Sequence, residues 1–132
     1  MAVCALLACH GALAQNYPTR SVRFIVPYPP GGATDIITRA IGAKLSTALG
    51  QQFLVDNRGG GGQKIGTALA AKAPADGYTM LLVSVTHSIN PGLDPKLPYD
   101  SIRDFAPVTL MATSPNALVT HPSVPARTVK DL

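Results

Sequence analysis

The sequence predicts an α/β fold in which helices flank a mostly parallel sheet. Three consecutive patterns support this: an apolar strand at Val22–Val26, a Pro/Gly turn that leads into an amphipathic helix, and a second apolar strand at residues 52–55. A strand, a helix and a strand in this order imply a right-handed parallel crossover. The near-continuous apolar character of the first strand suits a parallel strand that is covered on both faces.

The helix of this unit is expected to begin at Ala33. Apolar residues recur through it at helical spacing, and Gly50 is placed to end it as a C-cap glycine. The turn before it, residues 27–32, ends in two glycines. A strand that stops in glycines and leads straight into a helix leaves the first helical N–H groups without intrahelical partners, at the positive end of the helix dipole. We therefore interpret this turn as a seat for an anion.

The rest of the chain is predicted to form a second helix, further strands and a capped turn. Four glycines, residues 59–62, form a loop before a second helix, whose apolar face is expected at Ile65 and Leu69. Tyr78–Val85 is the most apolar segment and is predicted as the central strand. Asp100 or Ser101 is expected to cap a turn over residues 101–105, and residues 108–112 and 117–120 to form one interrupted strand or two strands.

The length and both ends of the chain bear on its organisation. The 132 residues suffice for one domain but are at the low end for an α/β unit, and a helix that would start at Thr128 has no second turn, so we expect a part of a longer protein. Residues 1–14 are apolar and end in an A-x-A pattern, which predicts a secretory signal peptide. Residues 15–21 then form a polar tether. The alternatives are a buried N-terminal helix and a lipid anchor at Cys9.

Composition excludes several classes of protein. Cys4 and Cys9 both lie in the leader, so the mature chain has no cysteine for a disulfide, for thiol chemistry or for a metal. The eleven Lys and Arg residues, which give a net charge of +4, are scattered singly, which argues against a nucleic-acid partner. No apolar run after Gln15 approaches the roughly 20 residues of a membrane helix.

The sequence also lacks complete motifs for catalysis, for nucleotide binding and for metal binding. Lys64 lacks the preceding Gly and the following Ser or Thr of a Walker A loop. Ser84 lies between two valines rather than in a G-x-S-x-G elbow. Neither His87 nor His121 has a partner at metal-ligand spacing. We therefore expect no catalytic residue, no metal and no cofactor.

Two strand ends form the candidate binding region. In open α/β sheets, ligands lie at the carboxyl ends of strands, and both Gly31–Gly32 and Thr86–Pro91 lie at such ends. His87 is expected either as a satisfied turn residue or as a ligand contact. Asp35 favours the helix dipole whether or not anything binds. Its charge would repel an anion unless water intervenes or the ligand also carries an amine or a hydroxyl.

Five ordered segments together resemble a known family. They are VPYPPGGATD, VDNRGGGGQKIGT, KAPADGYTMLL, THSINP and KLPYDSIRDFAPVTL. In order and spacing they are similar to the Bug-type periplasmic solute receptors of tripartite tricarboxylate transporters, over essentially the whole mature chain. The chain departs from the family at Gly59, where members commonly have a proline that restrains the turn.

The resemblance implies a two-lobed, type II periplasmic-binding-protein fold that is considerably longer than this chain. Residues 22–120 would be an incomplete first lobe, and residues 121–132 the start of the crossover to a second lobe. A carboxylate would be held by backbone N–H groups of the loop before the first helix, with a second wall on the same lobe. The implied ligand-binding residues are Tyr28, Pro30, Gly31, Gly32, Ala33, Thr34, Asp35, Ser84, Thr86 and His87.

The function expected from this is a receptor in the periplasm, monomeric at full length. It would capture a small di- or tricarboxylate and present it to the membrane permease subunits of a tripartite tricarboxylate transporter. One alternative is a ligand-sensing periplasmic module that feeds a sensor kinase. Another is an enzyme acting on a carboxylate or phosphate, for which the mature chain offers no nucleophile, base or metal shell with a partner.

Overall fold

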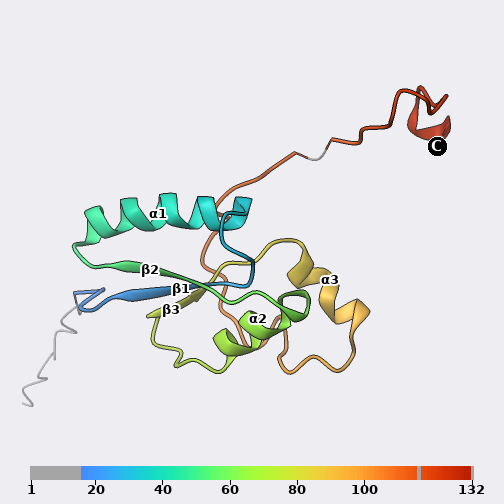
Figure 1. The fold of residues 1–132 in the computed structure, drawn as a ribbon. Coiled ribbons are helices and arrows are strands. Elements are labelled where there is room, and N and C mark those ends of the chain that lie inside the picture. Colours follow the sequence, from blue (N-terminus) through green and yellow to red (C-terminus); the bar gives the residue numbers. More distant parts are fainter. Residues whose placement is uncertain (1–15, 116, 132) are drawn as a thin grey trace, which may run out of the picture.

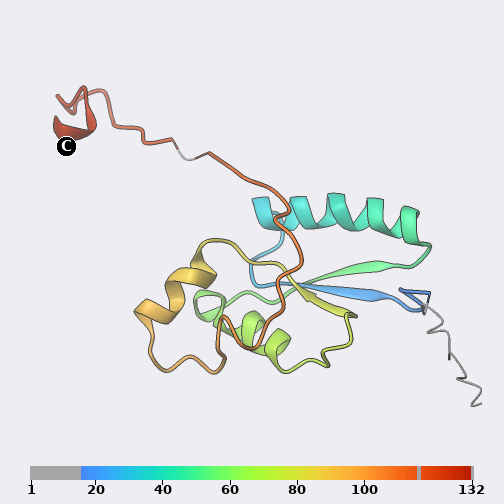
Figure 2. The ribbon, with the colours of Figure 1, turned by 180° about the vertical axis from the view of Figure 1, so that it is seen from behind.

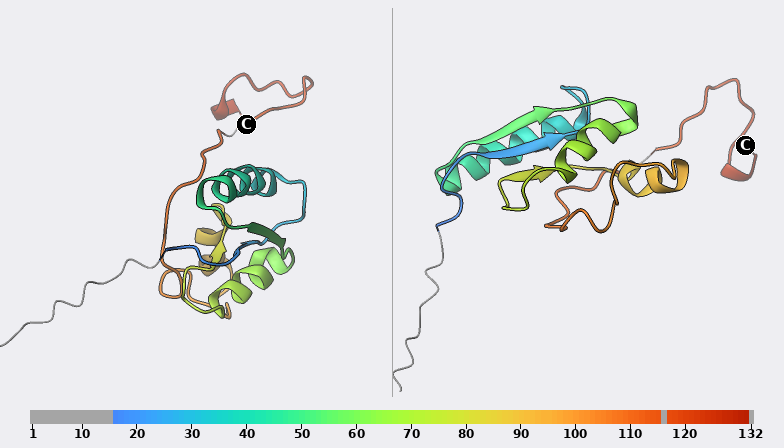
Figure 3. Two further views of the ribbon diagram at one scale, coloured as in Figure 1. Left: turned by 90° about the vertical axis from the view of Figure 1, so that its left-hand side faces the viewer. Right: turned by 90° about the horizontal axis from the view of Figure 1, so that it is seen from below.

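The computed structural model describes residues 16–115 and 117–131, so the expected signal peptide with Cys4 and Cys9 lies outside the described residues. The fold is a three-stranded parallel sheet of order β2-β1-β3 (Figure 1, and from behind in Figure 2). Helices α1 and α2 lie on opposite faces of the sheet (Figure 3), which confirms the predicted α/β class. The elements are β1 Val22–Val26, α1 Ala33–Leu49, β2 Phe53–Asn57, η1 Gly61–Gln63, α2 Lys64–Ala71, β3 Thr79–Leu81, α3 Thr86–Leu93 and η2 Val129–Asp131.

The first strand and the first helix have the predicted bounds. Strand β1 pairs on both sides, so that Phe24 is in register with Val55 of β2 and Met80 of β3. Helix α1 ends as expected at Gly50, which has φ 67° and donates its amide to the carbonyl of Ser46 at 3.1 Å. The apolar core therefore lies between β1, its neighbours and α1.

The central strand is β1, and the prediction that Tyr78–Val85 occupies the centre is wrong. Strand β3 has three residues and lies at one side of the sheet. Its pairing ends where the amide of Leu82 donates to the carbonyl of Ile25 at 3.0 Å. Beyond it Val85 is 71% exposed and the chain turns into α3. The apolar character of a segment does not say which strands will flank it.

The second helix packs through small residues. Ile65 and Leu69, the expected apolar face, are exposed, whereas Gly66 and Thr67 are buried. A Cβ at Gly66 would lie 2.6 Å from the carbonyl oxygen of Arg58. The expectation was wrong because α2 approaches the neighbouring backbone too closely for a large side chain at the contact.

The second strand is longer at its carboxyl end than the predicted residues 52–55. Asp56 and Asn57 remain in the ladder because they are in register with Ile25 and Val26 of β1. This extension places two polar side chains, on opposite faces, at the end of β2.

The turn over residues 101–105 is capped as expected, by Asp100. The Asp100 carboxylate accepts the amides of Ile102 and Arg103, each at 2.9 Å. The carboxylate of Asp104 accepts the amide of Asp100 at 2.7 Å. These reciprocal bonds satisfy donors at both ends of the turn.

The predicted strands at residues 108–112 and 117–120 are not present in the part of the chain that the structure describes. Val108 and Val119 are 79% and 83% exposed, and residues 117–120 lie away from the sheet, towards the C-terminus (Figure 2). A strand needs a partner for its N–H and C=O groups, and this segment pairs with none of the described strands. Among the described residues, no helix has the length and apolar character to cross a membrane.

Candidate functional site

Tyr28 and Ser84 join the two strand ends that the sequence singled out. Tyr28 follows β1 and Ser84 follows β3, and because the strands are parallel neighbours, both residues lie at the same edge of the sheet. Their hydroxyl oxygens are 2.5 Å apart, and the amide of Ser84 donates to the Tyr28 hydroxyl at 3.2 Å. The two expected walls of the site therefore meet.

The amides that directly precede Asp35 at the start of α1 have no acceptor among the described residues. They belong to Gly32, Ala33 and Thr34. Gly32 is the N-cap, has φ −74° and ψ 166°, and no side chain caps the helix there. Free amides at a helix N-terminus, together with the positive end of the dipole, favour an anion.

The donor set is smaller than the sequence suggested. Pro30 has no N–H, and the amide of Gly31 donates to the carboxylate of Asp35 at 2.9 Å. Gly31 also has φ +84°, a conformation that favours glycine. The expectation of free donors throughout the loop is therefore corrected to residues 32–34.

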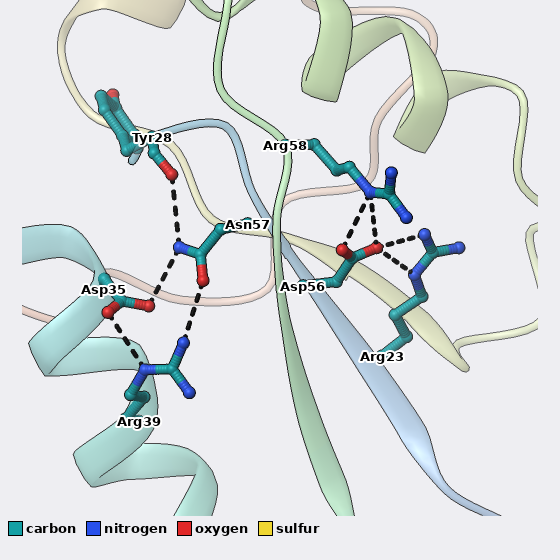
Figure 4. Close-up of polar contacts among 7 residues, drawn as sticks. All are labelled: Arg23, Tyr28, Asp35, Arg39, Asp56, Asn57 and Arg58. Atoms are coloured by element: carbon teal, nitrogen blue, oxygen red, sulfur yellow. Dashed lines mark hydrogen bonds and ion pairs between the residues drawn. The ribbon is translucent and has the colours of Figure 1, made fainter. Parts of the chain in front are cut away.

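Asp35 is buried and fully engaged with the protein. It is 3% exposed, and besides the Gly31 amide it accepts the Arg39 guanidinium at 3.0 Å and the Asn57 side-chain amide at 3.0 Å (Figure 4). The hydrogen bond from Arg39, followed by those from Gly31 and Asn57, lowers the pKa of Asp35 to about 2. The charge of Asp35 is therefore permanent at neutral pH and is compensated by Arg39.

Asn57 is a residue of the site that the sequence analysis missed. Its side-chain nitrogen donates to the carbonyl of Tyr28 at 3.2 Å as well as to Asp35, and its oxygen accepts the Arg39 guanidinium at 2.9 Å (Figure 4). Asn57 thus fastens the end of β2 to the loop after β1 and to α1. Its position at the carboxyl end of a parallel strand was a signal that could have found it.

A second ion cluster lies at the end of β2, on the other face of the sheet. Arg23 and Arg58 both contact the carboxylate of Asp56 (Figure 4), with Nε to oxygen distances of 2.8 Å for Arg23 and 2.9 Å for Arg58. Burial raises the pKa of Asp56, but the hydrogen bonds from the two arginines outweigh it, so the net shift is downward. Two cations against one carboxylate leave this edge of the sheet with a positive excess.

His87 and Thr86 lie at the start of α3. The imidazole Nε2 of His87 donates to the carbonyl of Ser101 at 3.1 Å. Its ring is parallel to Tyr99, with centroids 6.1 Å apart, and Phe105 packs edge-on against it at 5.3 Å. The side-chain contacts of His87 therefore fix α3 to the turn after it, whereas its backbone amide donates to the carbonyl of Ser84 at 3.0 Å.

The free amides lie on an open surface. Gly32 and Ala33 are exposed. One hollow of the surface is formed by residues 120–127 and another lies between α1 and β2, and neither includes residues 32–34. In the described ranges, no group of three His, Cys, Asp or Glu side chains could hold a metal ion.

Solved structures define the class of protein. The fold is similar to MatC from Rhodopseudomonas palustris with bound malate, with a TM-score of 0.68 and 36% identity over 72% of this chain and 33% of that one. It is similar to the periplasmic binding protein BugD, with a TM-score of 0.61 and 38% identity over 64% of this chain and 28% of that one. The chain thus has the fold of part of a periplasmic binding protein.

The sequence model of the tripartite tricarboxylate transporter family receptor matches residues 37–132, and the chain belongs to this family. BugT of Bordetella pertussis is 43% identical over 84% of this chain and 35% of BugT. A protein encoded in the tcbD–tcbE intergenic region of Pseudomonas sp. strain P51 is 50% identical over 78% of this chain and 31% of that protein. The chain therefore spans about a third of these relatives. The resemblance to Bug-type receptors is confirmed, and the family is one of receptors, as expected, rather than of enzymes.

Proposed function

We propose that this chain forms most of the first lobe of a two-lobed receptor that captures a small di- or tricarboxylate. The observation that carries the proposal is the set of free amides of Gly32, Ala33 and Thr34 at the sheet edge where Tyr28 and Ser84 meet. Two relatives from Rhodopseudomonas palustris support the ligand class, because MatC was solved with malate and Rpa4515 with adipate. Both ligands are dicarboxylates.

The chemistry of the seat suits a carboxylate. Backbone amides at a helix N-terminus donate to its oxygens, and the dipole favours its charge. Asp35 adds no net repulsion because Arg39 neutralises it. One hydroxyl hydrogen of the Tyr28 and Ser84 pair is left over by their mutual bond and can serve as a further donor.

The hydrogen bonds available on this lobe supply too little binding free energy for tight binding, so a second lobe is needed. Hydrogen bonds to a charged group contribute about 1.5–3 kcal/mol each, so two or three give roughly 3–9 kcal/mol before ordering costs, whereas micromolar affinity needs about 8 kcal/mol. An open seat on one lobe therefore falls short of tight binding. Residues beyond this chain supply the remaining contacts.

The cellular role follows from the family and from the leader. A signal peptide at residues 1–14 exports the receptor to the periplasm, and relatives of known structure are periplasmic proteins. There it acts as a monomer and presents its ligand to the permease subunits of a tripartite tricarboxylate transporter.

A thermal-shift screen of the full-length receptor tests the ligand class. Malate, adipate, succinate and citrate are compared with succinamide and with acetate. We expect di- or tricarboxylates to raise the melting temperature and succinamide to leave it unchanged. A crystal structure of the best complex should place a carboxylate on the amides of residues 32–34. The proposal fails if no carboxylate stabilises the receptor, or if the bound acid group lies away from these amides.

A further inference from the structure

The position of Ser84 depends on the start of α3. The pairing of β3 with β1 ends at the backbone amide of Leu82. Between this point and α3, residues 83–85 are exposed and belong to no strand or helix. Besides its bonds to Tyr28, Ser84 is held through its carbonyl, which accepts the backbone amide of His87 at 3.0 Å. Whatever fixes the first turn of α3 therefore also fixes Ser84.

Helix α3 depends on contacts outside itself. Its buried residue is Asn90, whereas Ile89 and Leu93 are 47% and 76% exposed. Pro91 lies inside the helix and has no N–H, so the carbonyl of His87, four residues before it, lacks its usual helical donor. A short helix that has a missing hydrogen bond and exposed apolar side chains must be fixed by its neighbours.

His87 and Ser101 fix the start of α3 through two reciprocal hydrogen bonds. The imidazole Nε2 donates to the Ser101 carbonyl at 3.1 Å, and the Ser101 hydroxyl donates at 3.4 Å to the His87 carbonyl that the proline leaves free. Tyr99 and Phe105 pack against the imidazole ring. The second imidazole nitrogen, Nδ1, is buried. In this arrangement one nitrogen is engaged and the other is covered, so the imidazole offers a ligand no free hydrogen-bonding group.

We propose that His87 is a positioning residue of the carboxylate site and that it acts through Ser84. Its side chain, held by Ser101, fixes the first turn of α3, and its backbone amide fixes the Ser84 carbonyl. The Ser84 hydroxyl is thereby kept beside Tyr28. The inference rests on the proposed function, because it takes the Ser84 and Tyr28 hydroxyls as part of the carboxylate seat. It predicts that the imidazole affects binding only while the Ser84 hydroxyl is present.

Two amide substitutions at His87 test the inference by calorimetry on the full-length receptor. Malate, succinate, adipate and citrate are titrated into the wild type, and the acid with the lowest Kd is used for all variants. The side-chain nitrogen of glutamine lies about as far from the backbone as Nε2 of histidine, whereas that of asparagine lies about as far as Nδ1. We therefore expect His87→Gln to keep the affinity within about threefold, and His87→Asn, which cannot reach the Ser101 carbonyl, to weaken it by about fivefold or more.

The Ser84→Ala background separates positioning from direct contact. There His87→Asn should cost less than about twofold in affinity, because the hydroxyl that His87 positions is no longer present. Lys64→Met is the control, because it removes the ion pair with Asp94 at the other end of α3, and it should leave the affinity within about twofold. If urea unfolding shows that His87→Asn does not fold, Ser101→Ala takes its place and should weaken binding by about twofold or more only where Ser84 is intact.

The outcomes distinguish the inference from the proposed function. Equal losses from His87→Asn with and without the Ser84 hydroxyl would mean that the imidazole acts on the ligand directly, and would overturn the inference. Wild-type affinity in folded His87→Asn, or an equally large loss in His87→Gln or Lys64→Met, also overturns it. If Ser84→Ala binds like the wild type, the inference falls while carboxylate capture on the amides of residues 32–34 stands. If none of the four acids binds, both fall together.

Discussion

Tyr28 and Ser84 are 56 residues apart in the chain, yet their hydroxyl oxygens lie 2.5 Å from each other. The pairing follows from topology, because β1 and β3 are parallel neighbours and their carboxyl ends share one edge of the sheet. The Ser84 amide also donates to the Tyr28 oxygen. Whichever hydroxyl donates in the pair, one of the two hydroxyl hydrogens is left over for another acceptor.

We expect Tyr28→Phe and Ser84→Ala each to weaken carboxylate binding to the full-length receptor by about tenfold or more, because a hydrogen bond to a charged group contributes about 1.5–3 kcal/mol. The double variant should lose less than the sum of the two single losses, since either single change already breaks the mutual hydrogen bond that orients the remaining hydroxyl. Calorimetry with the best acid of the thermal-shift screen measures all three.

Tyr17→Phe is the matched control for this cycle. It removes a tyrosine hydroxyl that donates to the carbonyl of Gly77, before the start of β3, at the opposite end of the strands. Binding should be unchanged in this variant. Strictly additive losses for Tyr28 and Ser84 would show that the two hydroxyls do not act as a unit.

The amides at the start of α1 can be tested with Gly32→Val. Gly32 has an extended backbone, and a Cβ there would meet only the carbonyl oxygen of Pro29, at an ordinary 3.7 Å. The fold should therefore tolerate the change to within about 0.5 kcal/mol of unfolding free energy. The branched side chain would cover the neighbouring amides, and we expect carboxylate binding to be lost.

Ala40→Val adds a similar bulk to the exposed side of α1 and serves as the control for Gly32→Val. It should leave binding unchanged. Calorimetry measures binding, and urea unfolding confirms that both variants are folded. Normal binding by folded Gly32→Val would remove these amides from the site.

Local patterns were sufficient to predict the β1–α1 unit. The apolar run of β1, the helical spacing of α1 and the C-cap at Gly50 are all encoded within a few residues of where they act. The position of β3 was not predictable in this way, because apolarity reports burial and not which strands are neighbours. The small contact face of α2 at Gly66 was missed for a similar reason, since a close approach depends on the backbone of Arg58.

The location of the candidate site was predictable from the sequence, whereas most of its hydrogen bonds were not. The turn at Gly31–Gly32 was located from glycines between a strand and a helix. The occupation of the Gly31 amide by Asp35, and the role of Asn57, depend on hydrogen bonds between three elements. Such bonds are set by the tertiary fold, so sequence spacing alone does not show them.

The stability of the fold should depend on Asp35 at acid pH. The pKa of Asp35 is about 2 in the folded chain, against an ordinary value of 3.8. As the pH falls, the unfolded chain takes up this proton first, so the contribution of Asp35 is complete above about pH 4 and is lost as the pH falls through about 2. Urea unfolding of wild type and Asp35→Asn at several pH values should show a shallower decline in the variant.

The Asp35→Asn variant will keep part of this decline in stability at acid pH. The pKa values of Asp56, Asp94 and Asp100 are also lowered, at Asp94 by the Lys64 side chain and at Asp100 by backbone amides. The test is therefore the difference between the two slopes. Identical slopes between pH 4 and pH 2 would show that the Asp35 cluster does not form in solution.

Among the glycines that pack around the sheet, Gly66 is expected to tolerate substitution least. A Cβ there would lie 2.6 Å from the carbonyl oxygen of Arg58 and 2.8 Å from the Cβ of Pro27. Because the closer atom belongs to the backbone, α2 must move away from the end of β1 to admit even a methyl group. We expect Gly66→Ala to lower the free energy of unfolding by about 1–3 kcal/mol. Urea unfolding of the full-length receptor measures this.

Gly92→Ala provides the contrast, because a Cβ at Gly92 in α3 has no atom within 4 Å. It should be neutral or stabilise by up to about 1 kcal/mol. Pro27 immediately precedes Tyr28, so the displacement caused by Gly66→Ala should also reach the Tyr28 hydroxyl and weaken carboxylate binding, whereas Gly92→Ala should not. Similar stability and binding in the two variants would show that α2 can shift without disturbing the site, and that the close packing at Gly66 does not position Tyr28.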